Sequence, residues 1–172
     1  MKRICIVAIA CLMLFPEAAL SQTRRRTTTR RSAPTGQRAA DSVSAGAARV
    51  AEQIKTLSRF LYLLGGISKD IAAVDEAARR NQASPAAVQQ ADKSKAVVRT
   101  SLKNVREGLD QLEIDFRVTP ALQPYYIKLA GVAAGAAAAE DKAAANQLDQ
   151  SGRSLLEVVN RLTDVLLEMQ KR

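Results

Sequence analysis

The pattern of apolar positions divides most of the chain into long amphipathic helices. From about residue 41, mostly apolar residues recur at alternating spacings of four and three, the period of one helix face. The first stripe consists of Val43, Ala47, Val50, Ile54, Leu57, Leu61, Leu64, Ser68 and Ile71. Asp41 or Ser42 can cap its N-terminus, because either side chain accepts a hydrogen bond from an unpaired backbone amide. A long first helix is therefore predicted, and the glycine pair at 65–66 indicates a bend or a close helix contact within it.

Proline residues set the boundaries of the next two helices. Ser84 followed by Pro85 combines a capping side chain with a proline at the first helical position. The second stripe consists of Val88, Ala91, Lys95, Val98, Leu102, Val105, Leu109, Leu112 and Phe116. This helix should end near Arg117. Pro124 would disrupt a helix already under way, so the third helix should begin near that residue.

The last stripe continues without a change of register almost to the C-terminus. It consists of Ile127, Gly131, Ala134, Ala138, Asp141, Ala145, Leu148, Gly152, Leu155, Val159, Leu162, Leu166 and Met169. A single straight helix of this length would extend far beyond the second helix and expose its most apolar third to water. We therefore predict a reversal between Asp141 and Gly152, with Asn146, Asp149 or Ser151 capping a fourth helix.

These elements predict an all-α protein, an antiparallel up-down bundle of long helices in which four helices are favoured. The alternative is an elongated three-helix bundle that dimerises. A chain with 3% aromatic residues and no Trp suits helices better than strands. We expect helix over nearly all of residues 43–170 outside links near 81–84, 118–123 and 141–152, with no strand.

Residues 1–21 have the three zones of a secretory signal peptide. A short cationic start precedes an apolar run that ends at Phe15, and small residues follow with Ala19 and Ser21 at the −3 and −1 positions. The run is shorter than the roughly 20 residues of a spanning helix. Cleavage after Ser21 and export to the periplasm or extracellular space are expected. Both cysteines, Cys5 and Cys11, would leave with the signal peptide.

Residues 22–40 carry no acid and no apolar period. Their arginines are Arg24, Arg25, Arg26, Arg30, Arg31 and Arg38. Such a segment buries too little surface to offset its ordering entropy, so we expect a disordered linker before a bundle domain over 41–172. It is either a solvated leader or an electrostatic tether to an anionic surface such as phospholipid, lipopolysaccharide or wall polymer. Export and the lack of stacking aromatics argue against nucleic acid.

The expected mature sequence lacks the residues that most often carry chemistry. It has no His and no Cys, which removes the commonest general base, the thiol nucleophile and most transition-metal ligands. The acidic pairs Glu113/Asp115 and Glu140/Asp141 project to different sides of their helices, so we interpret them as solvated surface. No cofactor and no enzymatic activity are predicted.

Two features depart from the pattern. Lys95 and Asp141 are charges on otherwise small or apolar stripes, and a bundle can bring them together as a buried pair. Each can also lie near a helix end with its charge in water. Tyr125 and Tyr126 gather near Phe116 at one connection, where they either plug the end of the bundle or contact a ligand or partner.

We therefore expect a non-enzymatic extracytoplasmic interaction or scaffold protein, held near an anionic surface by its basic segment. Its partner would be an unidentified protein or an anionic envelope component, and both peripheral membrane association and a homodimer are compatible with this hypothesis. The alternative is a ligand-binding or sensory bundle with a pocket between helices near the Ala-rich residues 130–145.

Overall fold

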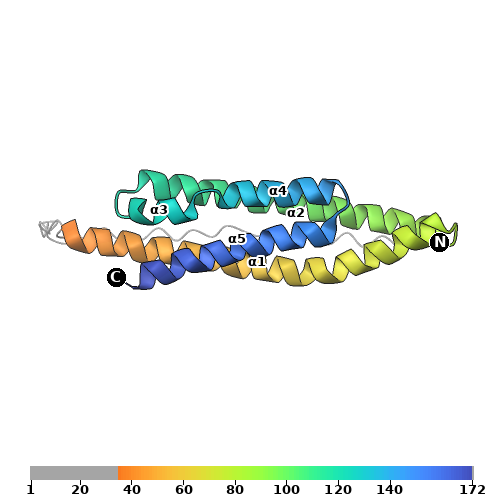
Figure 1. The fold of residues 1–172 in the computed structure, drawn as a ribbon, viewed down its shortest axis with the longest axis horizontal. Helices are drawn as coiled ribbons and strands as arrows, with labels where there is room; N and C mark the ends of the chain where they lie inside the picture. The colour runs from red at the N-terminus through yellow and green to blue at the C-terminus, as the bar shows by residue number, and fades with distance from the viewer. Residues whose placement is uncertain (1–34, 172) are drawn as a thin grey trace, which may run out of the picture. The chain divides into compact units, whose positions relative to one another are not determined.

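The computed structural model describes residues 35–171, which are helical apart from short connections (Figure 1). The helices are α1 (Thr35–Arg79), α2 (Pro85–Val118), α3 (Gln123–Leu129), α4 (Val132–Ala144) and α5 (Leu148–Gln170). No strand occurs among these residues. The prediction of an all-α bundle is confirmed. The expected signal peptide and residues 22–34 of the expected linker lie outside the described residues.

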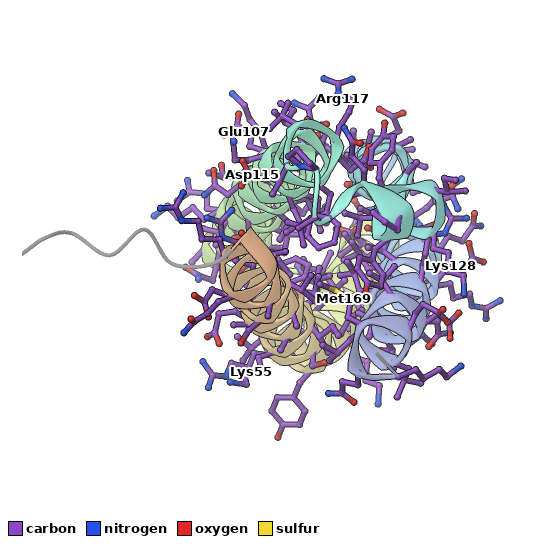
Figure 2. The ribbon with its side chains drawn as sticks, turned by 90° about the vertical axis from the view of Figure 1, so that its left-hand side faces the viewer. Lys55, Glu107, Asp115, Arg117, Lys128 and Met169 are labelled. Carbon is purple, nitrogen blue, oxygen red and sulfur yellow. The ribbon has the colours of Figure 1, made fainter. Side chains whose placement is uncertain are left out.

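The helices form four rods, one of which is divided into α3 and α4. Ion pairs between Asp75 and Lys95 at one end, and between Arg49 and Asp115 at the other, show that α2 runs back alongside α1. Helices α3 and α4 return along α2, and α5 packs against α1, α3 and α4. Figure 2 views the rods end-on around a filled interior, where Met169 of α5 lies.

The core consists largely of the predicted stripes of the first two helices. Its members on α1 and α2 are Val50, Leu57, Leu64, Ile71, Ala91, Val98, Leu102, Val105, Leu109, Leu112 and Phe116. Full burial of a leucine or phenylalanine side chain stabilises the fold by about 1.5–3 kcal/mol. Packing of these faces, rather than intrinsic propensity, therefore accounts for such long helices.

The predicted start of the first helix is wrong. Helix α1 begins at Thr35, so Asp41 and Ser42 lie inside it and cap nothing, and the Ser42 hydroxyl donates to the carbonyl of Arg38 (2.9 Å). Residues 36–41 are exposed. Extending an established helix requires no burial, because each added residue gains a backbone hydrogen bond, and residues 37–40 (Gln, Arg, Ala, Ala) favour a helix. The expected disordered linker therefore overlaps α1 over residues 35–40.

Two asparagines with positive φ end long helices in the same way. Asn81 (φ 58°) follows α1 and Asn146 (φ 60°) follows α4. In both turns an amide reaches back five residues: Gln82 donates to Ala77, and Gln147 donates to Lys142. This arrangement satisfies the last carbonyls of a helix, and Asn tolerates the left-handed conformation that it requires. Asn146 is therefore the terminator of α4 and not, as predicted, the cap of the fourth helix.

The reversal at residues 145–147 lies within the predicted window. The alternative of an uninterrupted third helix is wrong, because Leu155 and Leu162 of α5 are fully buried in the chain's own core. The predicted register before the turn is also wrong, since Ile127 is 82% exposed. The buried residues there are Leu129, Val132, Ala133, Ala136, Ala139 and Ala143. Gly131 (φ 91°) breaks the rod, and the methyl groups of the next helix carry no amphipathic signal.

Of the two alternatives expected at the glycine pair 65–66, a bend or a close helix contact, the close contact does not occur among the described residues. A Cβ at either position would meet nothing within 4 Å among the described residues. Close approaches occur instead at Gly46, beside Leu122, and at Gly135, where a Cβ would lie 2.7 Å from Val158 Cγ2. The Ala-rich α4 is thus thin enough for α5 to pack tightly against it.

Candidate functional site

The α1–α2 hairpin extends beyond the turn that joins α4 to α5 (Figure 1). Arg99 of α2 marks where that turn lies, because its Nη2 donates to the carbonyl of Ala144 (3.2 Å). Past this point one side of α1, including Ala72 and Arg79, still lines a hollow together with residues 146–150 at the turn. We call residues 72–90 the hairpin arm. None of them is fully buried, whereas the flanking Ile71 and Ala91 are only 4% and 6% exposed.

The hairpin arm has an apolar seam that is covered from one direction only. Val74 of α1 is half-buried and packs against the core, and Val88 of α2 is half-buried as well. A groove of about 310 Å³ runs beside the seam. It is lined by Ile67, Asp70, Ile71, Val74, Ala87, Gln90, Ala91 and Ser94. In a complete four-helix bundle, further helices would cover this seam.

An ion pair joins α1 and α2 at the base of the hairpin arm. Lys95 Nζ lies 2.8 Å from Asp75 Oδ1 and 3.8 Å from an Asp92 carboxylate oxygen, and the lysine side chain is 13% exposed. Asp141 lies exposed on α4. The predicted pairing of Lys95 with Asp141 is therefore wrong. A lysine on an apolar stripe indicates that an acidic residue lies close to it in the folded protein. Which acidic residue this is depends on the register between the helices, and the spacing of residues along the chain does not determine that register.

The two tyrosines lie at the opposite end of the bundle. Tyr125 is buried on α3 with the neighbouring core residues Phe116 and Leu122. Tyr126 is half-buried against the same core. This agrees with the interpretation of Tyr125 as a plug of the bundle end, since its ring contributes to the core rather than to an open surface.

The structure describes one of the six arginines in the predicted tether. Arg38 is exposed near the start of α1. The remaining five, Arg24, Arg25, Arg26, Arg30 and Arg31, lie outside the described residues. Arg38 meets no other predicted site residue, so the tether stays a prediction from the sequence.

Three acidic residues interpreted as solvated surface instead make specific contacts. Glu113 Oε1 accepts hydrogen bonds from the backbone amides of Gly131 (3.0 Å) and Ala133 (2.9 Å), which caps α4 from another helix. Asp115 pairs with Arg49, and Glu140 lies 3.1 Å from Arg106 Nε. For these acids the sequence analysis compared only neighbours on the same helix, and so it missed their contacts across helices.

A cleft of about 210 Å³ opens between α4 and α5. Small residues, including Gly131, Gly135 and Ala138, form one side. Two hydrogen bonds cross to α5: Lys142 Nζ of α4 donates to the buried Ser154 hydroxyl (2.6 Å), and Arg161 Nη1 donates to the carbonyl of Ala130 (3.1 Å). This cleft adjoins the Ala-rich segment where the alternative hypothesis expects a pocket.

No group of three acidic side chains within residues 35–171 is arranged to hold a metal ion. None of the helices described there combines the length and apolarity needed to cross a bilayer. Comparison with known proteins finds no matching family model, no matching curated protein and no matching solved structure.

Proposed function

We propose that this protein is a non-enzymatic, exported interaction module whose hairpin arm binds an α-helix of a partner protein. The half-covered seam of the arm carries this proposal. Val74 and Val88 are the most apolar residues of the hairpin arm, and the groove lined by Val74 and Ala87 leaves room for another apolar face. An amphipathic helix laid into such a groove would complete the packing that α4 and α5 provide elsewhere in the bundle.

The arginine-rich segment complements this activity by keeping the protein near an anionic envelope surface. Net charge is +9 for the whole chain, and residues 22–40 contain six arginines without an acid. A cationic segment of this kind is attracted to anionic phospholipid or wall polymer without a folded binding site. The module would thereby meet its partner at a surface rather than in bulk solution.

Site-specific photo-crosslinking in the producing cell tests the hairpin arm directly. A photoreactive residue replaces Val74 or Val88, and a matched one replaces Glu107, an exposed position of α2 in the four-rod part. We expect adducts with a distinct protein at the two arm positions and none at Glu107. Equal labelling at Glu107, no adduct at either arm position, or adducts only with a second copy of this chain would each contradict the proposal.

The cleft between α4 and α5 favours a second candidate function, the binding of a small anion. Lys142 and Arg161 supply two cationic side chains to its lining and Ser154 a hydroxyl, against the single carboxylate of Glu157. Small carboxylates and phosphates are the ligands that such groups recognise. A panel of these anions should raise the melting temperature of the wild type but not of Lys142→Met. No shift with any of them would exclude this function.

A further inference from the structure

The side of α1 that faces solvent carries an aromatic residue without an intramolecular role. Residues along it follow the three-four spacing of one helix face: Glu52, Lys55, Arg59, Tyr62, Gly66, Lys69, Ala73 and Glu76. We call this set the outer face. Tyr62 is 85% exposed, and the adjacent Leu63 is 59% exposed. Aromatic residues are enriched where proteins bind one another, and the chain has only three tyrosines.

The glycine pair at 65–66 provides space at the centre of the outer face. Glycine in the interior of a helix makes the helix less stable than alanine would. A glycine pair at this place is therefore useful only where another group approaches the helix backbone closely. A Cβ at either position would meet nothing within 4 Å, and so the bundle itself does not require these glycines. Another molecule could therefore bring a helix backbone close to α1 at this point.

The charges of the outer face are complementary to themselves when the direction of the helix is reversed. Lys55 lies ten residues before Gly65, and Glu76 lies ten residues after Gly66. Glu52 and Arg79 lie thirteen residues away on the two sides. A second α1 laid antiparallel across the glycine pair would thus place base opposite acid at both distances.

The same geometry accounts for the exposed tyrosine. Tyr62 and Lys69 lie three residues away on the two sides of the glycine pair, so each ring would face a lysine of the other copy, an arrangement that favours a cation–π contact. Among the described residues, the hydrogen bonds of the Lys55 and Glu76 side chains stay within α1. Lys55 donates to Glu52, and Glu76 accepts from Arg79 and Arg80. The side chains of Lys55 and Glu76 are 61% and 46% exposed and can exchange partners at little cost. Figure 2 shows Lys55 directed away from the bundle interior.

We propose that the protein forms a symmetric homodimer in which the outer faces of two α1 helices cross antiparallel at Gly65–Gly66. The contact is isologous, so it closes at two copies and does not propagate into a filament. The two hairpin arms would then point in opposite directions. This proposal does not depend on the partner-binding function, because it concerns a different surface and is tested without a partner.

Two charge reversals test the antiparallel register. The chain is expressed over residues 1–172, and the purified protein is studied by sedimentation equilibrium. The wild type should be a dimer. Lys55→Glu and Glu76→Lys should each weaken association about tenfold, since each reversal sets like charges opposite each other at two symmetric places. An equimolar mixture of the two variants should recover wild-type affinity, because both places are then occupied by opposite charges.

A substitution at the crossing provides the second readout. Gly66→Leu should yield monomers whose helix content and melting temperature at low concentration are no lower than those of the wild type, because leucine favours a helix more than glycine does and a Cβ at this position meets nothing within 4 Å among the described residues. Ala96→Leu, which adds the same bulk at an exposed position of α2, should leave the dimer intact. A wild type that remains monomeric over a wide range of concentration would overturn the proposal, as would a mixture of the two charge variants that fails to associate. Dimers that persist in Gly66→Leu would also overturn it.

Discussion

Glu113 on α2 accepts a hydrogen bond from the backbone amide of Ala133, at 2.9 Å, and so caps α4, whose N-cap residue Gly131 lies eighteen residues further along the chain. Helix α4 has no capping side chain of its own, because its N-cap residue is a glycine. The carboxylate satisfies two amides at the positive end of the helix dipole. It thereby stabilises the break between α3 and α4, which permits the close packing of α4 on α5.

Removal of this cap should therefore destabilise the bundle. Glu113→Ala is expected to lower the free energy of unfolding by about 1–2 kcal/mol, because two partly buried amides lose their acceptor. Glu113→Gln keeps an oxygen acceptor and should lose less. Chemical denaturation followed by circular dichroism measures both. Glu107→Ala, at an exposed position on the same helix, should change stability by less than about 0.5 kcal/mol. Equal losses at the two positions would show that the cap contributes nothing.

Glycine-to-alanine substitutions should have opposite effects at two places in the bundle. Gly65→Ala meets empty space and should raise the stability of the monomer by about 1 kcal/mol, the helix-propensity difference. Gly135→Ala would place its Cβ 2.7 Å from Val158 and should cost about 1–3 kcal/mol through overpacking. Thermal melts at low protein concentration distinguish them. A loss of stability in Gly65→Ala would mean that α1 requires the glycine for its own conformation.

The core of α5 belongs to the chain's own bundle, so its truncation should be costly at every concentration. Leu162 is fully buried, and Leu162→Ala should cost about 2–5 kcal/mol. Leu156, which is 51% exposed on the same helix, serves as the control, and Leu156→Ala should cost less than about 1 kcal/mol. Sedimentation should show the same oligomeric state for Leu162→Ala as for the wild type. Release of monomers by this substitution would mean that α5 forms a seam between molecules.

The sequence predicted the helices best where bulky residues mark one face. The stripe of α2 from Ala91 to Phe116 is buried except at Lys95, because leucine, valine and phenylalanine make the difference between its faces large. The faces of α4 do not differ in this way, because most of its side chains are alanine methyl groups. A register read through its alanines failed because methyl groups pack equally well on several faces, and the phase change at Gly131 depends on a backbone conformation.

The spacing of apolar residues did not predict which side chains make contact between helices. The position of Lys95 on an apolar stripe indicates that it pairs with an acidic residue. It pairs with Asp75 rather than Asp141 because of the way α1 and α2 are aligned. The same holds for Glu113, whose role depends on the position of α4. The hairpin arm also depends on where the turn at Asn146 falls relative to the two longer helices, which residue spacing within any one helix does not determine.

The ion pair at the base of the hairpin arm should tolerate apolar replacement better than the loss of one partner. Asp75→Ala leaves Lys95, which is mostly buried, with only the more distant Asp92, and should cost about 1–3 kcal/mol. In Lys95→Met an apolar chain of similar length occupies the seam, while Asp75, 33% exposed, turns to water. Because desolvating a charge offsets much of what an ion pair contributes, we expect Lys95→Met to be nearly neutral. Urea unfolding of the two variants would contradict this account if Lys95→Met were the more damaging.

The arginine-rich segment should contribute to surface binding and not to stability. Residues 36–40 are exposed, so deletion of residues 22–40 removes no buried contact among those described and should leave the melting temperature unchanged. The same deletion should abolish sedimentation with vesicles of anionic phospholipid, since it removes six positive charges. Replacing the six arginines by lysine keeps the charge and should preserve binding, which separates electrostatic attraction from recognition of guanidinium groups. Added salt should weaken the binding of both the arginine and the lysine forms. If the deleted protein still binds the vesicles, the folded bundle and not the segment carries the affinity for the surface.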